Sequence, residues 1–278
     1  MSTQTSVQGQ SDVMSGVPIS IRHVSKTFGE DGERPFRALG DINIDIQPGE
    51  FISVVGPSGC GKSTLMLMVA GLLERSQGDI VVGAQSVNKP ITDVGIAFQD
   101  HLLLDFRTAM DNVMLQADVR GLDKAKIRAR ATELFEQLRL THAIDKYPRQ
   151  LSGGMRQRVS LVRTLVHDPS VILMDEPFGA LDALTRARLQ DELLKIVART
   201  RSTVVMVTHD VDEAVLLSDR VVMMTNGPAA TIGEILSVNL PRPRDRVELA
   251  ENPDYVHCRK AVLDFLYTRQ GHVEKASA

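Results

Sequence analysis

The stretch GPSGCGKST, from Gly56 to Thr64, lies between two apolar runs, FISVV before it and LMLMVAGLL after it. Gly56, four further residues and then Gly61, Lys62 and Ser63 have the spacing of a phosphate-binding P-loop between a strand and a helix. The glycines let consecutive backbone N–H groups point into one concavity at the amino end of the helix, where an anion binds. Lys62 is expected to reach the β- and γ-phosphates of a nucleotide, and Ser63 is expected to ligate Mg²⁺.

Each residue of this loop is a candidate contact for a bound nucleotide. The set is Gly56, Pro57, Ser58, Gly59, Cys60, Gly61, Lys62, Ser63 and Thr64. Cys60 stands at a helix amino terminus, a position that lowers the pKa of a thiol, so we expect its alkylation to block nucleotide binding. The alternative is a glycine-rich turn of an ordinary α/β protein, and the Lys-Ser pair after an apolar run argues against it.

Charge and cysteine content exclude several classes of protein. A net charge of −3 leaves no basic excess, so no nucleic-acid partner is expected. The two cysteines, Cys60 and Cys258, are too few for a disulfide framework and lack the spacing of a zinc site, which favours a reducing compartment. Residues 1–17 are rich in Ser and Gln and predict a disordered lead, not a signal peptide.

Apolar patterns divide the chain into strands and helices. Residues 18–28 predict an edge strand, and residues 41–50 alternate apolar and polar side chains as in a half-buried strand. Continuous apolar runs at residues 51–55 and 171–175 predict strands buried on both faces. Strands that alternate with helices indicate an α/β fold with a largely parallel sheet. No run approaches the roughly 18 apolar residues of a membrane-spanning helix, so we expect another chain to supply any span.

A mostly helical stretch interrupts this α/β pattern. Apolar residues recur at helical spacing from Thr108 to Asp118 and from Lys124 to Leu140, and Asp123 is a candidate N-cap. The second helix carries an apolar stripe that is expected to pack in the core. Its members are Ile127, Ala131, Leu134, Phe135 and Leu138.

Two acidic residues follow the apolar run VILM. Asp175 ends the predicted strand, and Glu176 comes directly after it. In P-loop enzymes the strand-terminal Asp holds the Mg²⁺ shell, and an adjacent carboxylate can polarise the attacking water. Asp175 is therefore the candidate metal ligand and Glu176 the candidate general base. A helix cap is the alternative interpretation of such a pair.

A second anion-binding turn is predicted within LSGGMRQRV, from Leu151 to Val159. Ser152, Gly153 and Gly154 directly precede a helical run, which places another set of free N–H groups at a helix amino end. One ATP presents one γ-phosphate. Two such turns in one chain therefore imply either two ligands or one ligand shared between two chains, and sharing requires a dimer.

Together these motifs resemble those of the nucleotide-binding subunits of ATP-binding cassette (ABC) transporters. GPSGCGKST is similar to the family's Walker A motif, LSGGMRQRV to its signature and VILMDEP to its Walker B motif. Gln99 resembles the Q-loop residue, Gly179 to Asp182 (GALD) the D-loop, and His209 in VTHD the switch histidine. The motifs occur in the family's order, and the resemblance covers roughly Ile19–Asn239.

The resemblance implies a P-loop NTPase of ABC type, with an antiparallel β edge and a helical subdomain. It also implies that two cassettes face head to tail, with ATP and Mg²⁺ between the Walker A motif of one and the signature of the other. The residues implied to act across the interface, from the second cassette, are Ser152 and Gly154. Gly153, Gln157 and Asp182 are further candidate nucleotide-binding residues.

Within one cassette the resemblance gives each motif a role. Glu176 is expected to polarise the attacking water, and His209 to contact the γ-phosphate. Gln99 is expected to report Mg²⁺ occupancy and to ligate the ion together with Ser63 and Asp175. Each of these positions carries the residue that the family uses for hydrolysis, so we expect a cassette that hydrolyses ATP.

Adenine recognition is predicted at an aromatic residue before the P-loop. The family stacks the base at this place, and Phe28 in VSKTF matches it, with Phe36 as the competitor. A base stacked on an aromatic ring contributes about 1–3 kcal/mol. A phenylalanine that only packs against the sheet is the alternative.

The tail resembles one branch of importers. The segment from Ser218 to Arg246 and the NPDYVHCRKAVLDFLY run look like ATP-binding subunits of nitrate importers and their bicarbonate and cyanate relatives. The implied partners are a second cassette in a homodimer or heterodimer, integral membrane permease subunits, and a periplasmic or lipid-anchored substrate-binding protein. The implied location is the cytoplasmic face of the inner membrane, as a peripheral subunit. Leu102 to Leu104 and Phe106 are the candidate permease contacts.

Nitrate is the expected transported anion, with bicarbonate, cyanate and sulfonate or taurine as alternatives. A soluble ABC ATPase of DNA repair or translation and a regulatory module that binds ATP without hydrolysis are alternatives from other classes. The expected domain division is a lead at 1–17, an ATPase domain at 18–250 with the helical subdomain at about 100–160, and a helical tail at 251–278.

Overall fold

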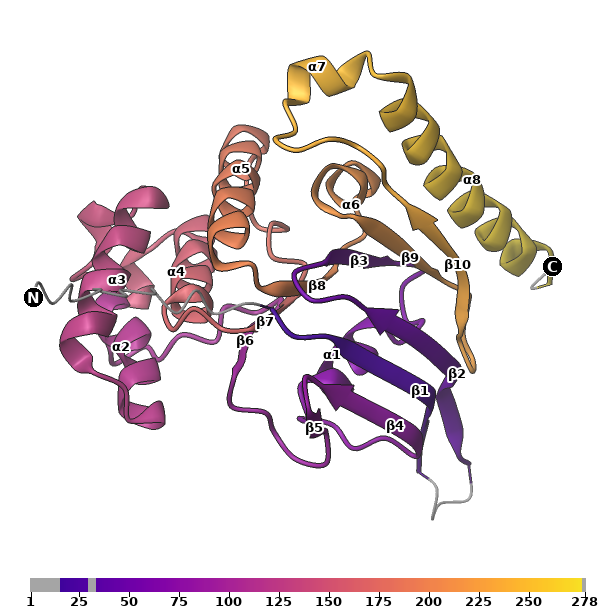
Figure 1. Ribbon diagram of the computed structural model, residues 1–278, viewed down its shortest axis with the longest axis horizontal. Helices are drawn as coiled ribbons and strands as arrows, with labels where there is room; N and C mark the ends of the chain where they lie inside the picture. Colours follow the sequence, from indigo (N-terminus) through magenta and orange to yellow (C-terminus); the bar gives the residue numbers. More distant parts are fainter. Residues whose placement is uncertain (1–15, 30–33, 277–278) are drawn as a thin grey trace, which may run out of the picture.

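The computed structural model describes residues 16–29 and 34–276, and its strands form two sheets (Figure 1). Most of the predicted lead at 1–17 lies outside the described residues. The antiparallel sheet has the order β2 (Phe36–Ile46), β1 (Ile19–Phe28), β4 (Gln77–Val82) and β5 (Gln85–Ser86). The larger sheet has the order β10 (Ile232–Ser237), β9 (Arg220–Met224), β3 (Phe51–Val55), β8 (Thr203–Val207), β7 (Val171–Asp175) and β6 (Val94–Ala97).

Neighbouring strands of the larger sheet run parallel from β9 to β6, and only the β10–β9 pair is antiparallel. The predicted, largely parallel sheet is therefore confirmed. The prediction of an edge strand at residues 18–28 is wrong, because β1 pairs with β2 on one side and with β4 on the other. The β4 strand reaches β1 from beyond the P-loop, a long-range pairing that the local pattern does not encode.

Helices cover both faces of the larger sheet. They are α1 (Lys62–Val69), α2 (Ala109–Arg120), α3 (Lys124–Gln137), α4 (Gly153–Leu165), α5 (Ala183–Thr200), α6 (Val211–Leu217), α7 (Arg246–Ala250) and α8 (Pro253–Ala276), with 3₁₀ turns η1 (Thr141–Ala143) and η2 (Pro148–Gln150). In Figure 1, α2, α3 and α4 form a helical group beyond the β6 edge. The helix predicted from Lys124 begins there with Asp123 as its N-cap, as expected, and its apolar stripe is buried.

Strands β7 and β8 separate two hydrophobic cores. Ile172, Met174, Val204 and Met206 point into the core shared with α2 to α6, and the alternate residues point into the core shared with α1 and the antiparallel sheet. This period of two explains why both runs are apolar throughout, since each strand must be buried on both faces.

The order of the parallel strands brings the predicted motifs together. The P-loop follows β3, and His209 lies two residues after β8. Asp175 ends β7, Glu176 comes directly after it, and Gln99 lies just after β6. Since β3, β8, β7 and β6 are successive neighbours and run parallel, their carboxyl ends meet at one edge of the sheet.

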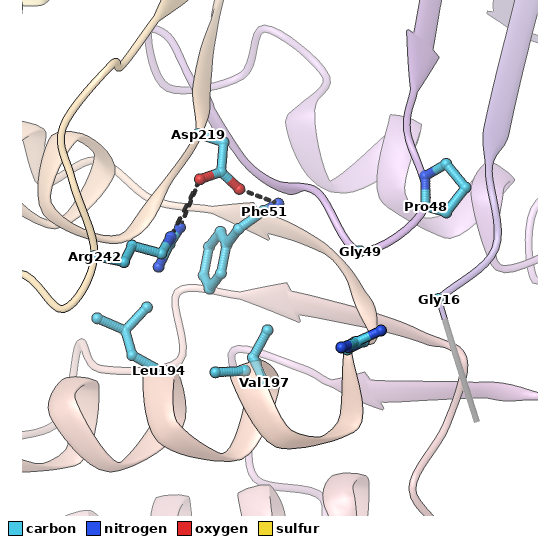
Figure 2. Close-up of a pocket in the computed structure, with 10 residues that line it drawn as sticks. Gly16, Pro48, Gly49, Phe51, Leu194, Val197, Asp219 and Arg242 are labelled. Carbon is cyan, nitrogen blue, oxygen red and sulfur yellow. Dashed lines mark hydrogen bonds and ion pairs between the residues drawn. The ribbon is translucent and has the colours of Figure 1, made fainter. Parts of the chain in front are cut away.

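The opposite, amino-terminal edge carries a cavity of about 450 Å³ and a network of charged residues. Figure 2 shows Phe51, Leu194 and Val197 in the cavity wall, with Asp219 beside Arg242. Asp219 accepts hydrogen bonds from the backbone N–H of Phe51 at 2.9 Å and from Arg242 at 2.8 Å. The start of β3 is thus fixed to the segment that follows β10.

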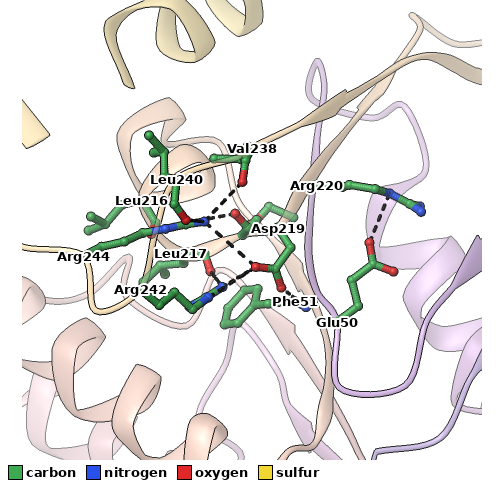
Figure 3. Close-up of polar contacts among 12 residues, drawn as sticks. Glu50, Phe51, Leu216, Leu217, Asp219, Arg220, Val238, Leu240, Arg242 and Arg244 are labelled. Carbon is green, nitrogen blue, oxygen red and sulfur yellow. Dashed lines mark hydrogen bonds and ion pairs between the residues drawn. The ribbon is translucent and has the colours of Figure 1, made fainter. Parts of the chain in front are cut away.

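Arg244, in the segment that follows β10, connects this segment to the end of α6 (Figure 3). Its side chain is 1 % exposed and lies 3.9 Å from Asp219. The guanidinium donates at 2.8–3.4 Å to backbone carbonyls near the end of α6 and after β10, namely those of Val215, Leu216, Ser218, Val238 and Leu240. Burial lowers the pKa of Arg244 to about 10, which still leaves the group charged at neutral pH.

We predict that Arg244→Met destabilises the fold by about 3 kcal/mol, because it leaves buried carbonyls without a donor. The measurement is the free energy of unfolding from denaturant titration. Arg242→Met is the matched control, since Arg242 binds the same Asp219 from a position 38 % exposed, and it is expected to cost about 1 kcal/mol or less. Equal losses for the two variants would contradict the prediction.

Candidate active site

The P-loop has the backbone that a phosphate-binding nest requires. Gly59 and Gly61 have φ of 77° and 89°, in the left-handed region that favours glycine. A Cβ at Gly61 would lie 2.6 Å from Leu39 Cδ2, so a larger residue would also collide with β2. Lys62 Nζ donates to the carbonyls of Gly56 and Pro57, both at 2.9 Å, and its ammonium therefore lies across the loop.

The expectation of a lowered thiol pKa at Cys60 is wrong. The side chain is fully buried, at 0 % exposure, and points beneath the loop, where a Cβ on Gly56 would lie 2.9 Å from its Sγ. Burial raises the pKa of the thiol, and the nearby charge of Lys62 only partly opposes that shift. Cys60 therefore supplies backbone to the nest and packs its sulfur into the core, where a thiol is inert.

The acidic pair lies directly beside the P-loop. The Asp175 carboxylate is 8 % exposed and accepts a hydrogen bond from Ser63. Burial raises the pKa of Asp175, and the charge of Glu176 adds to this shift. A cation bound here would stabilise the ionised carboxylate.

Glu176 and His209 face each other. Glu176 Oε1 is 3.2 Å from His209 Nδ1, with the glutamate side chain 24 % and the histidine 70 % exposed. Glu176 has φ of 47°, and its N–H donates to Val207 O at 2.9 Å across the β7–β8 pair. This turn aims the carboxylate toward His209. Gln99, the predicted Q-loop residue, is exposed just beyond β6, next to β7.

The signature turn caps α4. Ser152 Oγ accepts a hydrogen bond from Met155 N at 3.3 Å, and a Cβ on Gly154 would lie 2.9 Å from Leu181 Cδ2 in the predicted D-loop. Asp182 similarly caps α5 through Thr185 N at 3.0 Å. Gln157 is 2 % exposed, so its side chain lies inside the protein, away from the exposed surface at Ser152.

The signature and the P-loop are not assembled into one pocket within the chain. Helix α4 packs in the core shared with α2, α3 and α5, whereas α1 packs in the core on the other face of the sheet. Ser152 is exposed, and Gly153 and Gly154 are half-buried, so the signature turn lies at the surface.

The two adenine candidates are cross-strand neighbours. Phe28 pairs with Phe36 at the open end of the β1–β2 ladder, and the residues are 40 % and 53 % exposed. Lys26 Nζ lies 5.1 Å from the centre of the Phe28 ring. Both rings are thus partly exposed, and stacking of adenine on Phe28 stays a prediction.

Motif matching missed a buried group behind His209. Glu213 accepts hydrogen bonds from both Thr208 and Gln190, and the three residues are 6 %, 1 % and 1 % exposed. The sequence does contain a signal for this group. Glu213, the fourth residue after His209, is an acidic residue on the apolar side of helix α6, where a charged side chain needs a buried partner.

The ligands around Asp175 suit Mg²⁺ bound together with phosphate. Ser63, Asp175 and Gln99 all offer oxygen atoms, which Mg²⁺ prefers. Within the described ranges, no group of three or more His, Cys, Asp or Glu residues could hold a metal ion by itself. That fits an ion which takes few protein ligands and completes its shell with phosphate oxygens and water.

The P-loop, the acidic pair and the facing histidine define a P-loop ATPase. Comparison with known proteins makes the class specific, since the ABC transporter family model matches residues 39–179. The nitrate transport protein NasD of Klebsiella oxytoca is 48% identical over 91% of this chain and 97% of its own length. The bicarbonate transport ATP-binding protein CmpD of Synechocystis is 46% identical over 93% of this chain and 92% of its own length.

A solved structure shows the same fold. The ATP-binding cassette MJ0796, in a dimeric post-hydrolysis state with ADP and phosphate, superimposes with a TM-score of 0.72 at 30% identity. The match covers 80% of this chain and all of that one, 100%. The chain therefore belongs to the ABC transporter family, as an ATP-binding subunit that couples ATP hydrolysis to transport. The predicted ABC-type fold and ATPase activity are confirmed.

Proposed function

We propose that this subunit powers the import of nitrate. The observation that carries the proposal is the 48% identity to the nitrate transport protein NasD over nearly the whole of both chains. Bicarbonate is the second candidate, because CmpD is 46% identical over a similar span. The cassette itself does not touch the anion in this scheme. The choice between the two anions therefore lies with the partner subunits.

The geometry supports a division of labour at the sheet edge. Lys62 and the backbone N–H groups from Ser58 to Thr64 hold the phosphates, and Mg²⁺ when bound would supply charge neutralisation of those phosphates. Ser63, Asp175 and Gln99 hold that ion. Glu176 accepts a proton from the attacking water and is oriented by His209, which also contacts the γ-phosphate.

The second half of the site comes from a partner cassette. The Ser152 hydroxyl and the backbone N–H groups of Gly153 and Gly154 donate hydrogen bonds to the γ-phosphate across the interface. Asp182 lies at the interface between the two cassettes. The exposure of the signature turn and its separation from α1 support this arrangement. Because Gln157 is buried, its contribution is to hold α4 in place. Phe28 stacks the adenine.

We propose permease subunits and a periplasmic or lipid-anchored binding protein as the other partners. No described helix is both long and apolar enough to cross a bilayer. Phe106 and Leu102 are 75% and 53% exposed beside the helical group and would contact the permease, whereas Leu103 is 9% exposed and packs inward. The site of action is the cytoplasmic face of the inner membrane. We retain the division into an ATPase domain at 18–250 and a helical tail at 251–278.

The test is ATPase activity of the complete transporter. The subunit, its permease and its binding protein are purified together and reconstituted in liposomes, and phosphate release is measured with nitrate, bicarbonate, cyanate or taurine in the lumen with the binding protein. We expect nitrate to stimulate phosphate release at a lower concentration than the other three anions. Stimulation by bicarbonate alone would replace nitrate with the second candidate, and a rate that ignores every anion would contradict an import function.

A further inference from the structure

The segment that carries His209 is fixed from behind by a buried carboxylate. Glu213 Oε2 accepts a hydrogen bond from Thr208 Oγ1 at 2.8 Å, and Glu213 Oε1 accepts one from Gln190 Nε2 at 3.0 Å. Burial raises the pKa of Glu213, while the Thr208 hydrogen bond opposes that shift. Such a buried carboxylate is tolerated only where its oxygens have partners, and both oxygens have one here.

Both residues that flank His209 are held, although its own ring is exposed. Thr208 N donates to Val54 O at 3.2 Å, and Thr208 Oγ1 also accepts from Asp210 N at 3.0 Å. Arg186 on α5 donates to Asp210 Oδ2 at 3.2 Å and to Leu181 O at 3.3 Å, which joins this segment to the D-loop. The direction of the His209 side chain therefore depends on the framework beneath it.

The hydrogen-bonded chain continues into the C-terminal segment. Arg246 Nη2 donates to Gln190 Oε1 at 2.6 Å, and Arg246 Nε lies 3.2 Å from Asp191 Oδ1. Gln190 is thereby oriented with its amide nitrogen toward Glu213. Figure 1 shows α7, which begins at Arg246, above α5 and α6, with α8 passing beside α6. A continuous path thus runs from Arg246 through Gln190, Glu213 and Thr208 to His209.

We infer that Glu213 and Gln190 are positioning residues for His209, and that Arg246 of the C-terminal segment completes this support. The inference rests on the proposed function, in which His209 orients Glu176 and contacts the γ-phosphate. The supporting residues act on the turnover step and leave nucleotide binding to the P-loop. A misplacement of about 1 Å at a reacting group costs up to about 100-fold in rate.

The first test compares Thr208→Val with Thr208→Ser. Valine keeps the shape and removes the hydroxyl, whereas serine keeps the hydroxyl. We expect Thr208→Val to lower kcat for ATP hydrolysis by about 10- to 100-fold with KM for ATP changed less than about twofold, and Thr208→Ser to retain most of the wild-type kcat. Wild-type kcat in Thr208→Val, or a raised KM with kcat unchanged, would overturn the inference.

The second test uses two arginines of the C-terminal segment and avoids any risk of misfolding at the buried site. Arg246→Met removes the donor to Gln190 and is expected to lower kcat several-fold. Arg259→Met is the matched control, since Arg259 also pairs with an aspartate, Asp212 at 2.6 Å, from a position 47% exposed, but does not reach Gln190. Its kcat is expected to stay at the wild-type level. Equal kcat values for the two variants would count against the inference.

Variants in a His209→Ala background separate the inference from the proposed function. If Arg246 acts through His209, Arg246→Met causes no further loss of kcat in that background. A further several-fold loss would contradict action through His209. A His209→Ala variant with wild-type kcat would overturn both the proposed role of His209 and this inference, whereas a slow His209→Ala beside a fast Thr208→Val would overturn the inference alone.

Discussion

Glu176→Gln is expected to lower kcat for ATP hydrolysis by about 10²- to 10⁴-fold, the range that a positioned general base contributes. The amide is nearly isosteric and can still hydrogen-bond the attacking water, but it cannot accept a proton. ATP binding is expected to persist, because the Gly56–Thr64 loop and Lys62 are untouched. Steady-state phosphate release gives the rate, and equilibrium binding of labelled ATP gives the affinity.

Glu74→Gln is the matched control for this variant. Glu74 is exposed on the loop that follows α1 and lies outside the sheet edge where the motifs gather. Its rate is expected to equal that of the wild type. A Glu176→Gln variant that turns over ATP as fast as the wild type would remove Glu176 from the mechanism.

Mixing two inactive variants is expected to restore ATP hydrolysis. Lys62→Ala removes the phosphate-binding lysine of the P-loop. Ser152→Arg places a large side chain in the signature turn, which belongs to the composite site formed with the partner's P-loop. Each variant alone forms dimers in which both composite sites are defective, so activity falls close to zero. In a head-to-tail heterodimer of the two, one site combines two intact halves. The measurement is phosphate release against the mixing ratio, with a maximum at equal amounts.

The mixing experiment has a built-in control. Two chains that carry the same substitution, for example Lys62→Ala with two different affinity tags, cannot form an intact site at any ratio. They are expected to remain inactive. If the Lys62→Ala and Ser152→Arg mixture also remains inactive while heterodimers are recovered through the two tags, the shared-site arrangement is contradicted.

Much of the sheet edge was predictable from sequence because its motifs are local. The P-loop spacing, the acids after an apolar strand and the Asp123 N-cap each depend on a few consecutive residues, and short-range rules apply to them. The carboxyl ends of parallel strands then meet by topology alone. The Glu176–His209 contact follows from the β7–β8 pairing, which places the residues that follow these strands side by side.

The predictions that failed concern features set by long-range contacts in the folded chain, which no local sequence pattern encodes. The edge-strand prediction for β1 failed because its second neighbour, β4, arrives from beyond the P-loop. The predicted pKa of Cys60 was based on its position at a helix terminus, which lowers a thiol pKa. Burial of the sulfur raises the pKa by more, and burial does not follow from the local sequence. Gln190 and Glu213 lie on different helices, 23 positions apart, so no single motif could place their side chains in contact.

The hydrogen bonds of Arg244 all go to the main chain, although Asp219 also lies 3.9 Å away as an ion-pair partner. Each of its hydrogen-bond acceptors is a peptide oxygen, at Val215, Leu216, Ser218, Val238 and Leu240. Peptide oxygens are present whatever amino acid occupies a position. A substitution at one of these five positions therefore keeps the acceptor, whereas replacement of Arg244 by an apolar residue removes all five hydrogen bonds at once.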